Sequence, residues 1–98
     1  MKTKTLVAPL IHLNGTQQDD LVDSLDAAHV ALGAALDALR HCAPNGRDYY
    51  VQAVGAFESA VDQHRARSMA VANAQAEVEA IIGSILDDTT TAVAQVRD

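Results

Sequence analysis

The sequence has no tryptophan, a single cysteine and only three aromatic residues among its 98 residues. One cysteine cannot form a disulfide bridge within the chain, so no disulfide framework holds a fold of this size together. The chain also contains nineteen alanines, each of which adds only about one methyl group to a core, at roughly 25 cal/mol per Å² of buried apolar surface. Residues 1–98 therefore form a single domain with a marginal core, and we expect a partner chain to supplement it.

Basic residues are scarce as well. Seven lysines and arginines stand against ten aspartates and three glutamates, which gives a net charge of −6. The field of such a chain repels a phosphate backbone, so duplex nucleic acid is not an expected partner. The chain lacks the roughly 18 consecutive apolar residues of a membrane span, and no secretory signal pattern opens it. We therefore expect a cytoplasmic protein that does not bind a membrane.

The spacing of the apolar residues predicts an all-α protein, because no stretch shows the alternation typical of a strand. Residues 1–15 lack a helical period and contain Pro9, which indicates an extended N-terminal arm. Residues 16–88 are expected to form an antiparallel helical hairpin, and residues 89–98 a flexible or short helical tail. Two helices alone bury too little surface, so the hairpins should assemble into the helical bundle of a homo-oligomer.

The first helix is expected from about Gln17 to Cys42. Thr16 is a suitable N-cap, and Asp19 takes the capping-box position three residues later. The apolar face of this helix has alternating spacings of three and four residues and consists of Val22, Leu25, His29, Leu32, Leu36 and Leu39. A histidine within this face favours a structural role, in which His29 fixes the register of the packed helices.

The second helix is expected to start between about Tyr49 and Ala56, because Gly55 weakens its first turns. Its end is predicted near Asp87, since Thr89–Thr91 disfavour continuation. The same spacing of three and four residues runs through Val54, Phe57, Val61, His64, Ser68, Val71, Gln75, Val78, Ile82 and Ile85.

The connection between the helices holds the residues best suited to recognition. Asn45 and Gly46 can adopt left-handed backbone angles, which turn successive amide groups toward an anion. Arg47 adds a planar guanidinium that matches a phosphate or a carboxylate. Tyr49 and Tyr50 are two of the three aromatic residues, and they could stack on a base or a sugar. The loop is therefore a candidate site for a small anionic ligand such as a nucleotide.

Each of these features also has a structural interpretation. The loop could be a plain helix connection, in which one tyrosine packs on the hairpin and Arg47 pairs with Asp48 or Glu58. His64 and Arg67 lie on one side of the second helix and could form a further wall of an anion pocket. Alternatively, His64 is a half-buried histidine that forms a hydrogen bond across the helix pair.

The segment before the first helix is a second candidate for anion binding. Asn14 and Gly15 precede a helix N-terminus, and His12 lies beside them. The length of the first helix separates this segment from Arg47. One pocket can therefore contain both only if a neighbouring chain runs antiparallel and brings its loop alongside.

No pattern predicts catalysis, a metal ion or a cofactor. The four histidines show neither the His-x-x-x-His nor the Glu-x-x-His spacing of metal ligands. Cys42 lies on the predicted apolar face, where a small core residue is the simpler interpretation. Glu58 and Asp62 are four residues apart, and a solvated acidic face explains them. The sequence therefore predicts that the protein is not an enzyme.

Three segments carry a resemblance to a known group: Ile11–Thr16 with His-Leu-Asn-Gly-Thr, Ala43–Tyr50 with Pro-Asn-Gly-Arg-Asp-Tyr-Tyr, and Asp62–Arg67. They resemble small helical proteins encoded by bacteriophages and prophages, and the likeness covers roughly residues 10 to 87. In that group Gly-Pro often precedes the second helix, whereas this chain has Ala-Val-Gly at 53–55. The resemblance implies a phage accessory protein in the cytoplasm of a host bacterium, and it transfers no chemistry.

Two functions are compatible with this sequence, and the first is favoured. In the first, a helical oligomer sequesters a small anionic ligand, and its size and context are similar to those of the phage sponge proteins that capture signalling nucleotides to counter host defence. In the second, the chain is a helical protein-protein interaction or structural protein that blocks or bridges a host or virion protein, with the tyrosines as contact anchors.

Overall fold

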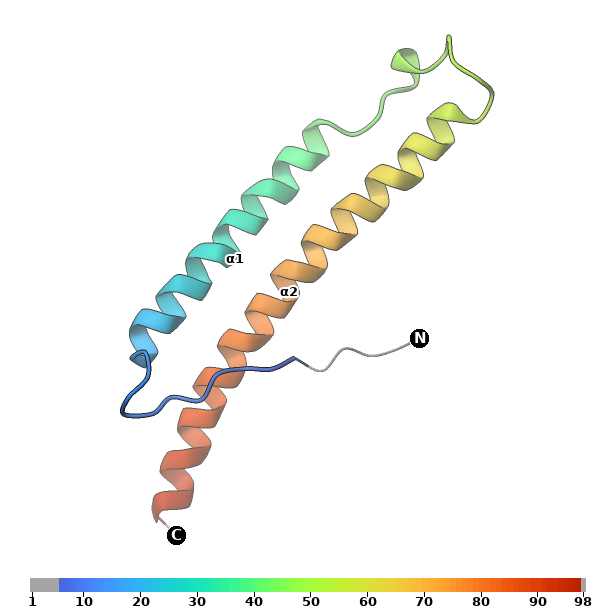
Figure 1. Cartoon of the computed structure of the whole chain (residues 1–98). Helices are drawn as coiled ribbons and strands as arrows, with labels where there is room; N and C mark the ends of the chain where they lie inside the picture. Colours follow the sequence, from blue (N-terminus) through green and yellow to red (C-terminus); the bar gives the residue numbers. More distant parts are fainter. Residues whose placement is uncertain (1–5, 98) are drawn as a thin grey trace.

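The structure is a computed structural model that describes residues 6–97, with side chains described for residues 6–87. Two helices, α1 (Gln18–His41) and α2 (Ala56–Arg97), pack against each other as a helical hairpin (Figure 1). A short 3-10 helix, η1 (Gly46–Asp48), lies in the loop between them. No strand occurs within residues 6–97. The all-α class and the packing of two helices, both predicted from the apolar spacing, are confirmed.

The bounds of α1 agree with the prediction to within one residue, but its predicted cap is wrong. The N-cap is Gln17, which makes no side-chain cap hydrogen bond. The backbone hydrogen bond from Leu21 N to Gln17 O (3.0 Å) starts the helix one residue after Thr16, which places the threonine hydroxyl outside the cap position. Asp19 and Asp20 still stabilise the first turn, because the helix dipole favours anions there.

Helix α2 starts within the predicted interval but continues past the predicted end near Asp87. It begins directly after Gly55, which has a φ of 91°. At its other end the helix runs on to Arg97. Thr89–Thr91 lower the helix propensity by only about 0.5 kcal/mol each, and no proline or glycine follows them. The sequence therefore lacks a residue strong enough to end the helix at Asp87, and α2 extends beyond α1 (Figure 1).

Alanine substitutions at two glycines, Gly55 and Gly83, should change the free energy of unfolding in opposite directions. Gly55 has a positive φ, whereas Gly83 lies inside α2, and a Cβ at either position would have no atom within 4 Å. We expect Gly55→Ala to lower the free energy of unfolding by about 1 kcal/mol, because alanine is strained at positive φ. Gly83→Ala should raise it by about 0.5–1 kcal/mol through helix propensity. Urea unfolding followed by circular dichroism measures both, and a more stable G55A protein would contradict the first expectation.

The two helices bury little between them. Among residues 6–87, Ile85 is the one hydrophobic side chain that is fully buried. The leucines of the predicted α1 face are half-buried, namely Leu25, Leu32, Leu36 and Leu39. The chain is elongated, with extents of 68 × 29 × 19 Å and a radius of gyration of 19.8 Å, against about 13 Å for a compact domain of this length. The predicted face is therefore real, but a single partner helix covers only part of it.

Polar contacts set the register between the helices. Gln75 Nε2 donates a hydrogen bond to the backbone oxygen of His29 (3.2 Å), and Nε2 of His29 lies 3.6 Å from Oε2 of Glu79. Gly33 lies beside this contact, because a Cβ on Gly33 would be 3.0 Å from Gln75 Nε2. The environment of His29 fits the structural role expected for it.

The N-terminal arm contains no helix or strand over residues 6–12. It ends in a turn closed by the hydrogen bond from Gly15 N to His12 O (3.1 Å). In the view of Figure 1 the arm turns back from the start of α1 and crosses α2. Leu6 and Ile11 are half-buried, whereas Leu13 is fully exposed.

Within the described residues, neither helix combines the length and the apolar character that crossing a membrane requires.

Candidate functional site

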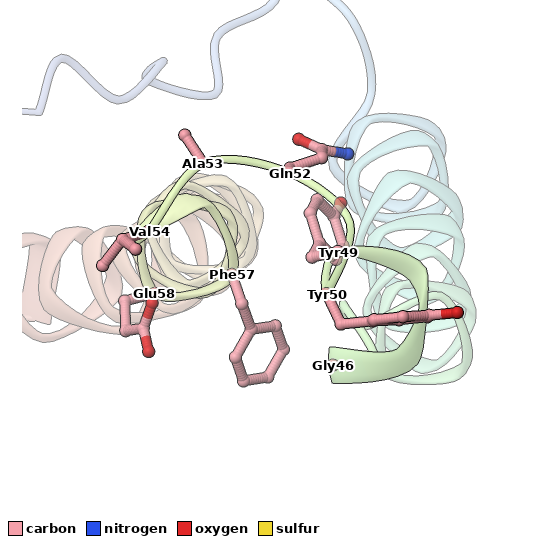
Figure 2. A pocket seen from close by; sticks show the side chains of 9 residues that line it. Gly46, Tyr49, Tyr50, Gln52, Ala53, Val54, Phe57 and Glu58 are labelled. Atoms are coloured by element: carbon pink, nitrogen blue, oxygen red, sulfur yellow. The ribbon is translucent and has the colours of Figure 1, made fainter.

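The loop between the helices borders an open cavity of about 290 Å³ at the tip of the hairpin, which we call the tip cavity (Figure 2). All three aromatic residues of the chain line it. The ring centroids of Tyr49 and Phe57 are 6.1 Å apart, with their planes tilted by 47°. The phenol of Tyr50 points away from Phe57 (Figure 2). The other lining residues are Gly46, Gln52, Ala53, Val54, Gly55 and Glu58.

The backbone of this loop does not form the predicted anion-binding geometry. Asn45 has extended angles, φ −116° and ψ 133°, and its side-chain oxygen accepts a hydrogen bond from Arg47 N (3.0 Å). The amides of Asp48 and Tyr49 donate to the carbonyl groups of Asn45 and Gly46 (both 3.0 Å). Among the described residues, only Gly55 has a positive φ. The amide groups of Arg47, Asp48 and Tyr49 are therefore used within the loop itself.

Arg47 lies outside the tip cavity and is exposed. Its guanidinium has no ion-pair partner among the side chains of residues 6–87, so the alternative pairing with Asp48 or Glu58 does not form either. By contrast, Arg40 pairs with Asp37 at 2.7 Å within α1. Glu58 is the charged residue that lines the cavity. In one chain, the tip therefore offers an aromatic surface with a carboxylate, and a separate cation beside it.

His64 joins the two helices, and neither His64 nor Arg67 lines the tip cavity. His64 Nε2 donates to the backbone oxygen of Leu39 near the end of α1 (2.9 Å). Arg67 Nη1 donates to His64 Nδ1 (3.3 Å). Both ring nitrogens of the half-buried His64 are thus engaged. The structure supports the structural interpretation of His64, a hydrogen bond across the helix pair.

His12 and Asn14 lie at the opposite end of α1 from the tip (Figure 1). The imidazole of His12 covers Gly15, because a Cβ on Gly15 would be 2.7 Å from His12 Nε2. Neither Asn14 nor Gly15 has a positive φ, so the second predicted anion-binding backbone is also absent. The 24 residues of α1, about 36 Å, separate this turn from Arg47. Within one chain, Gly46, Tyr49 and Tyr50 line the tip cavity, whereas the other predicted site residues lie outside it.

Part of the tip cavity consists of residues that the sequence did not indicate as a site. Six of its lining residues were not predicted site residues, namely Gln52, Ala53, Val54, Gly55, Phe57 and Glu58. One signal was present: all three aromatic residues fall within the nine residues 49–57. A spacing of eight residues between Tyr49 and Phe57 does not reveal a contact, because the intervening loop has no repeating geometry.

Among the described residues, no group of three or more His, Cys, Asp or Glu side chains is placed to hold a metal ion. Cys42 is exposed, which corrects the prediction of a core position, because α1 ends at His41 and Cys42 leaves the helical path with φ −109° and ψ 20°. Its thiol donates to the carbonyl of Leu39 at 3.5 Å.

The geometry thus consists of an aromatic tip cavity, an unpaired exposed arginine beside it, and a second polar turn at the far end of the hairpin. In comparisons with known proteins, no family model, no curated protein and no solved structure matches this chain.

Proposed function

We propose that this protein is a non-enzymatic binding module that acts as a homo-oligomer of helical hairpins. This proposal is based on the solvent-accessible surface of one chain, which is 7600 Å². A compact monomer of 10.3 kDa exposes about 5400 Å². The excess of about 2200 Å² is larger than the roughly 800 Å² that each partner buries in a standard protein interface. Further copies of the chain packed on the hairpin would cover this surface.

Light scattering coupled to size-exclusion chromatography tests the oligomer. At micromolar concentration we expect a mass of at least twice the 10.3 kDa of the chain. A mass equal to one chain across the concentration range would contradict the proposal.

The hairpin tip is the surface that we assign to partner recognition. Tyr50 and Val51 are 81% and 77% exposed, and Val54 is fully exposed. An exposed apolar patch marks a protein interaction site, and tyrosine is among the residues enriched as contact anchors in protein interfaces. No lysine or arginine lines the tip cavity, so its surface suits a protein better than an anion. In an infected bacterium, this tip would block or bridge a host or virion protein, as the resemblance to phage proteins implies.

A pull-down from infected-cell lysate with three purified proteins tests this assignment. The wild type should retain a partner that the variant Tyr50→Ser/Val54→Ser loses. Met69→Ser removes an exposed apolar side chain in α2, away from the tip, and should retain the partner. If all three proteins retain the partner equally, the tip is not the surface that binds it.

The second candidate function is sequestration of a small anionic ligand, such as a signalling nucleotide of host defence. The observation that favours it is the exposed guanidinium of Arg47, which lacks a carboxylate partner within residues 6–87 and stands three residues before the exposed Tyr50. Arginine and an aromatic ring together suit a phosphate and a base. Among the side chains of residues 6–87, Arg47 is the one cation at the tip without a carboxylate partner, so further contacts must come from another copy.

Thermal-shift measurements against nucleotides and cyclic nucleotides test this candidate. A ligand at 100 times its dissociation constant should stabilise the protein by about 2.7 kcal/mol. Arg47→Ala should abolish the shift. Arg65→Ala is the matched control, because Arg65 already pairs with Asp62 at 3.5 Å on α2, and it should preserve the shift. If no nucleotide in the panel raises the melting temperature, ligand sequestration is wrong and protein interaction is the remaining proposed function.

A further inference from the structure

Charge is divided unequally along the hairpin. Residues 37–67, the half that contains the tip, hold four arginines and four carboxylates. Residues 18–36 and 68–87, which form the open end, hold seven carboxylates and neither lysine nor arginine. Four of these carboxylates are exposed on α1, namely Asp19, Asp20, Asp23 and Asp26. The hairpin therefore has a neutral tip with a free arginine, and a strongly acidic opposite end.

This distribution decides between two ways of packing identical hairpins. A parallel arrangement places the two acidic ends together, with about fourteen carboxylates in one region, which is repulsive. An antiparallel arrangement places each acidic end beside the tip of the other chain. Arg47, which has no ion-pair partner among residues 6–87 of its own chain, then lies near carboxylates at the start of α1 in the second copy.

The outer surface of α1 is suited to the same arrangement. Val30 is 62% exposed and lies at the middle of Gln18–His41. Ala27 and Ala34, also exposed, are its neighbours one turn away on either side. Small side chains allow two helix axes to approach closely. A two-fold axis at Val30 would bury this apolar surface against its own copy.

From these observations we infer that two copies pair antiparallel through the outer surface of α1, with a two-fold axis near Val30. The inference rests on the proposed homo-oligomer and specifies its partner surface. The pairing brings Arg47 and Tyr50 of one chain beside the turn at His12 and Asn14 of the second copy, because each of these segments directly adjoins one end of α1. The residues that are separated in one chain form a composite site in the pair.

Disulfide cross-linking of the full chain tests the pairing. All variants carry Cys42→Ser, which removes the native thiol. Val30→Cys should form a covalent dimer on mild oxidation, because residue 30 meets its own copy at the axis. Asp23→Cys should remain monomeric on a non-reducing gel, because an antiparallel partner places a different residue opposite it. A cross-linked dimer of Asp23→Cys would show parallel pairing. If Val30→Cys forms no covalent dimer, the outer surface of α1 is not the interface. Either result overturns the inference.

Charge reversal gives an independent measurement by analytical ultracentrifugation. Arg47→Glu and Asp19→Arg should each raise the dimer dissociation constant about tenfold, since the pairing contains each contact twice. The double variant in one chain should recover most of the affinity. Arg65→Glu changes the net charge equally, away from this contact, and should have little effect. If none of these substitutions changes the dimer dissociation constant, the antiparallel pairing is wrong, but the proposed homo-oligomer still stands. If the wild type is a monomer, both the pairing and the homo-oligomer are wrong.

Discussion

Replacing Ile85 by alanine should lower the free energy of unfolding by about 3 kcal/mol, because truncating a buried isoleucine costs about 2–5 kcal/mol. Ile85 is 0% exposed. The contacts of His64 with Leu39 and of Gln75 with His29 define an antiparallel register that puts Ile85 opposite the first turn of α1. A loss of this size is a large fraction of the stability of a small domain.

The neighbouring residue provides the matched control for Ile85. Leu86 is 44% exposed, so Leu86→Ala should cost less than about 1 kcal/mol. Urea unfolding measures both variants, and two protein concentrations separate the stability of the hairpin from that of the oligomer. Equal losses for the two variants would mean that Ile85 does not anchor the hairpin.

His64→Ala should lower the free energy of unfolding by about 2 kcal/mol. The variant loses the hydrogen bond from His64 Nε2 to the carbonyl of Leu39, which contributes about 1 kcal/mol. It also loses the half-buried surface of the ring, which contributes about 1 kcal/mol more. This contact joins the start of α2 to the end of α1, so its loss should also loosen the tip. Amide hydrogen exchange near residues 39–46 reports that second effect.

Two further variants identify the atoms responsible at His64. Arg67→Ala removes only the exposed guanidinium contact to His64 Nδ1 and should change stability by less than about 0.5 kcal/mol. His64→Gln keeps an N–H donor that can reach Leu39 and should recover part of the loss. If Arg67→Ala costs as much as His64→Ala, the arginine contact and not the bond to α1 supports the helix pair.

These stability changes are separable from the functional proposals. Ile85 and His64 act between the helices of one chain, whereas Val30, Arg47 and Tyr50 are exposed and contribute little to the hairpin itself. Substitutions of the second group should leave the unfolding of the hairpin nearly unchanged while they alter association or binding. A loss of partner in the Tyr50→Ser/Val54→Ser variant, for example, therefore reports recognition and not unfolding.

The sequence alone was sufficient to predict that two helices form and where the loop between them lies. The spacing of Leu25, Leu32, Leu36 and Leu39 repeats along one face, and Pro44 with Gly46 ends the pattern. These signals are local, because helix period and helix breaking depend on residues within a few positions of each other. For the same reason the half-buried face of α1 was predicted correctly.

The tertiary structure decided how the loop is used. Asn45 is compatible with a left-handed turn and with a side-chain turn, and the structure has the second, which engages the amide of Arg47. The contact of Tyr49 with Phe57, the bond of His64 to Leu39 and the separation of His12 from Arg47 depend on how α2 returns along α1. Contacts between residues far apart in the chain follow from the packing of whole helices. At Asn45, the left-handed turn and the side-chain turn differ too little in free energy for the local sequence to select one of them.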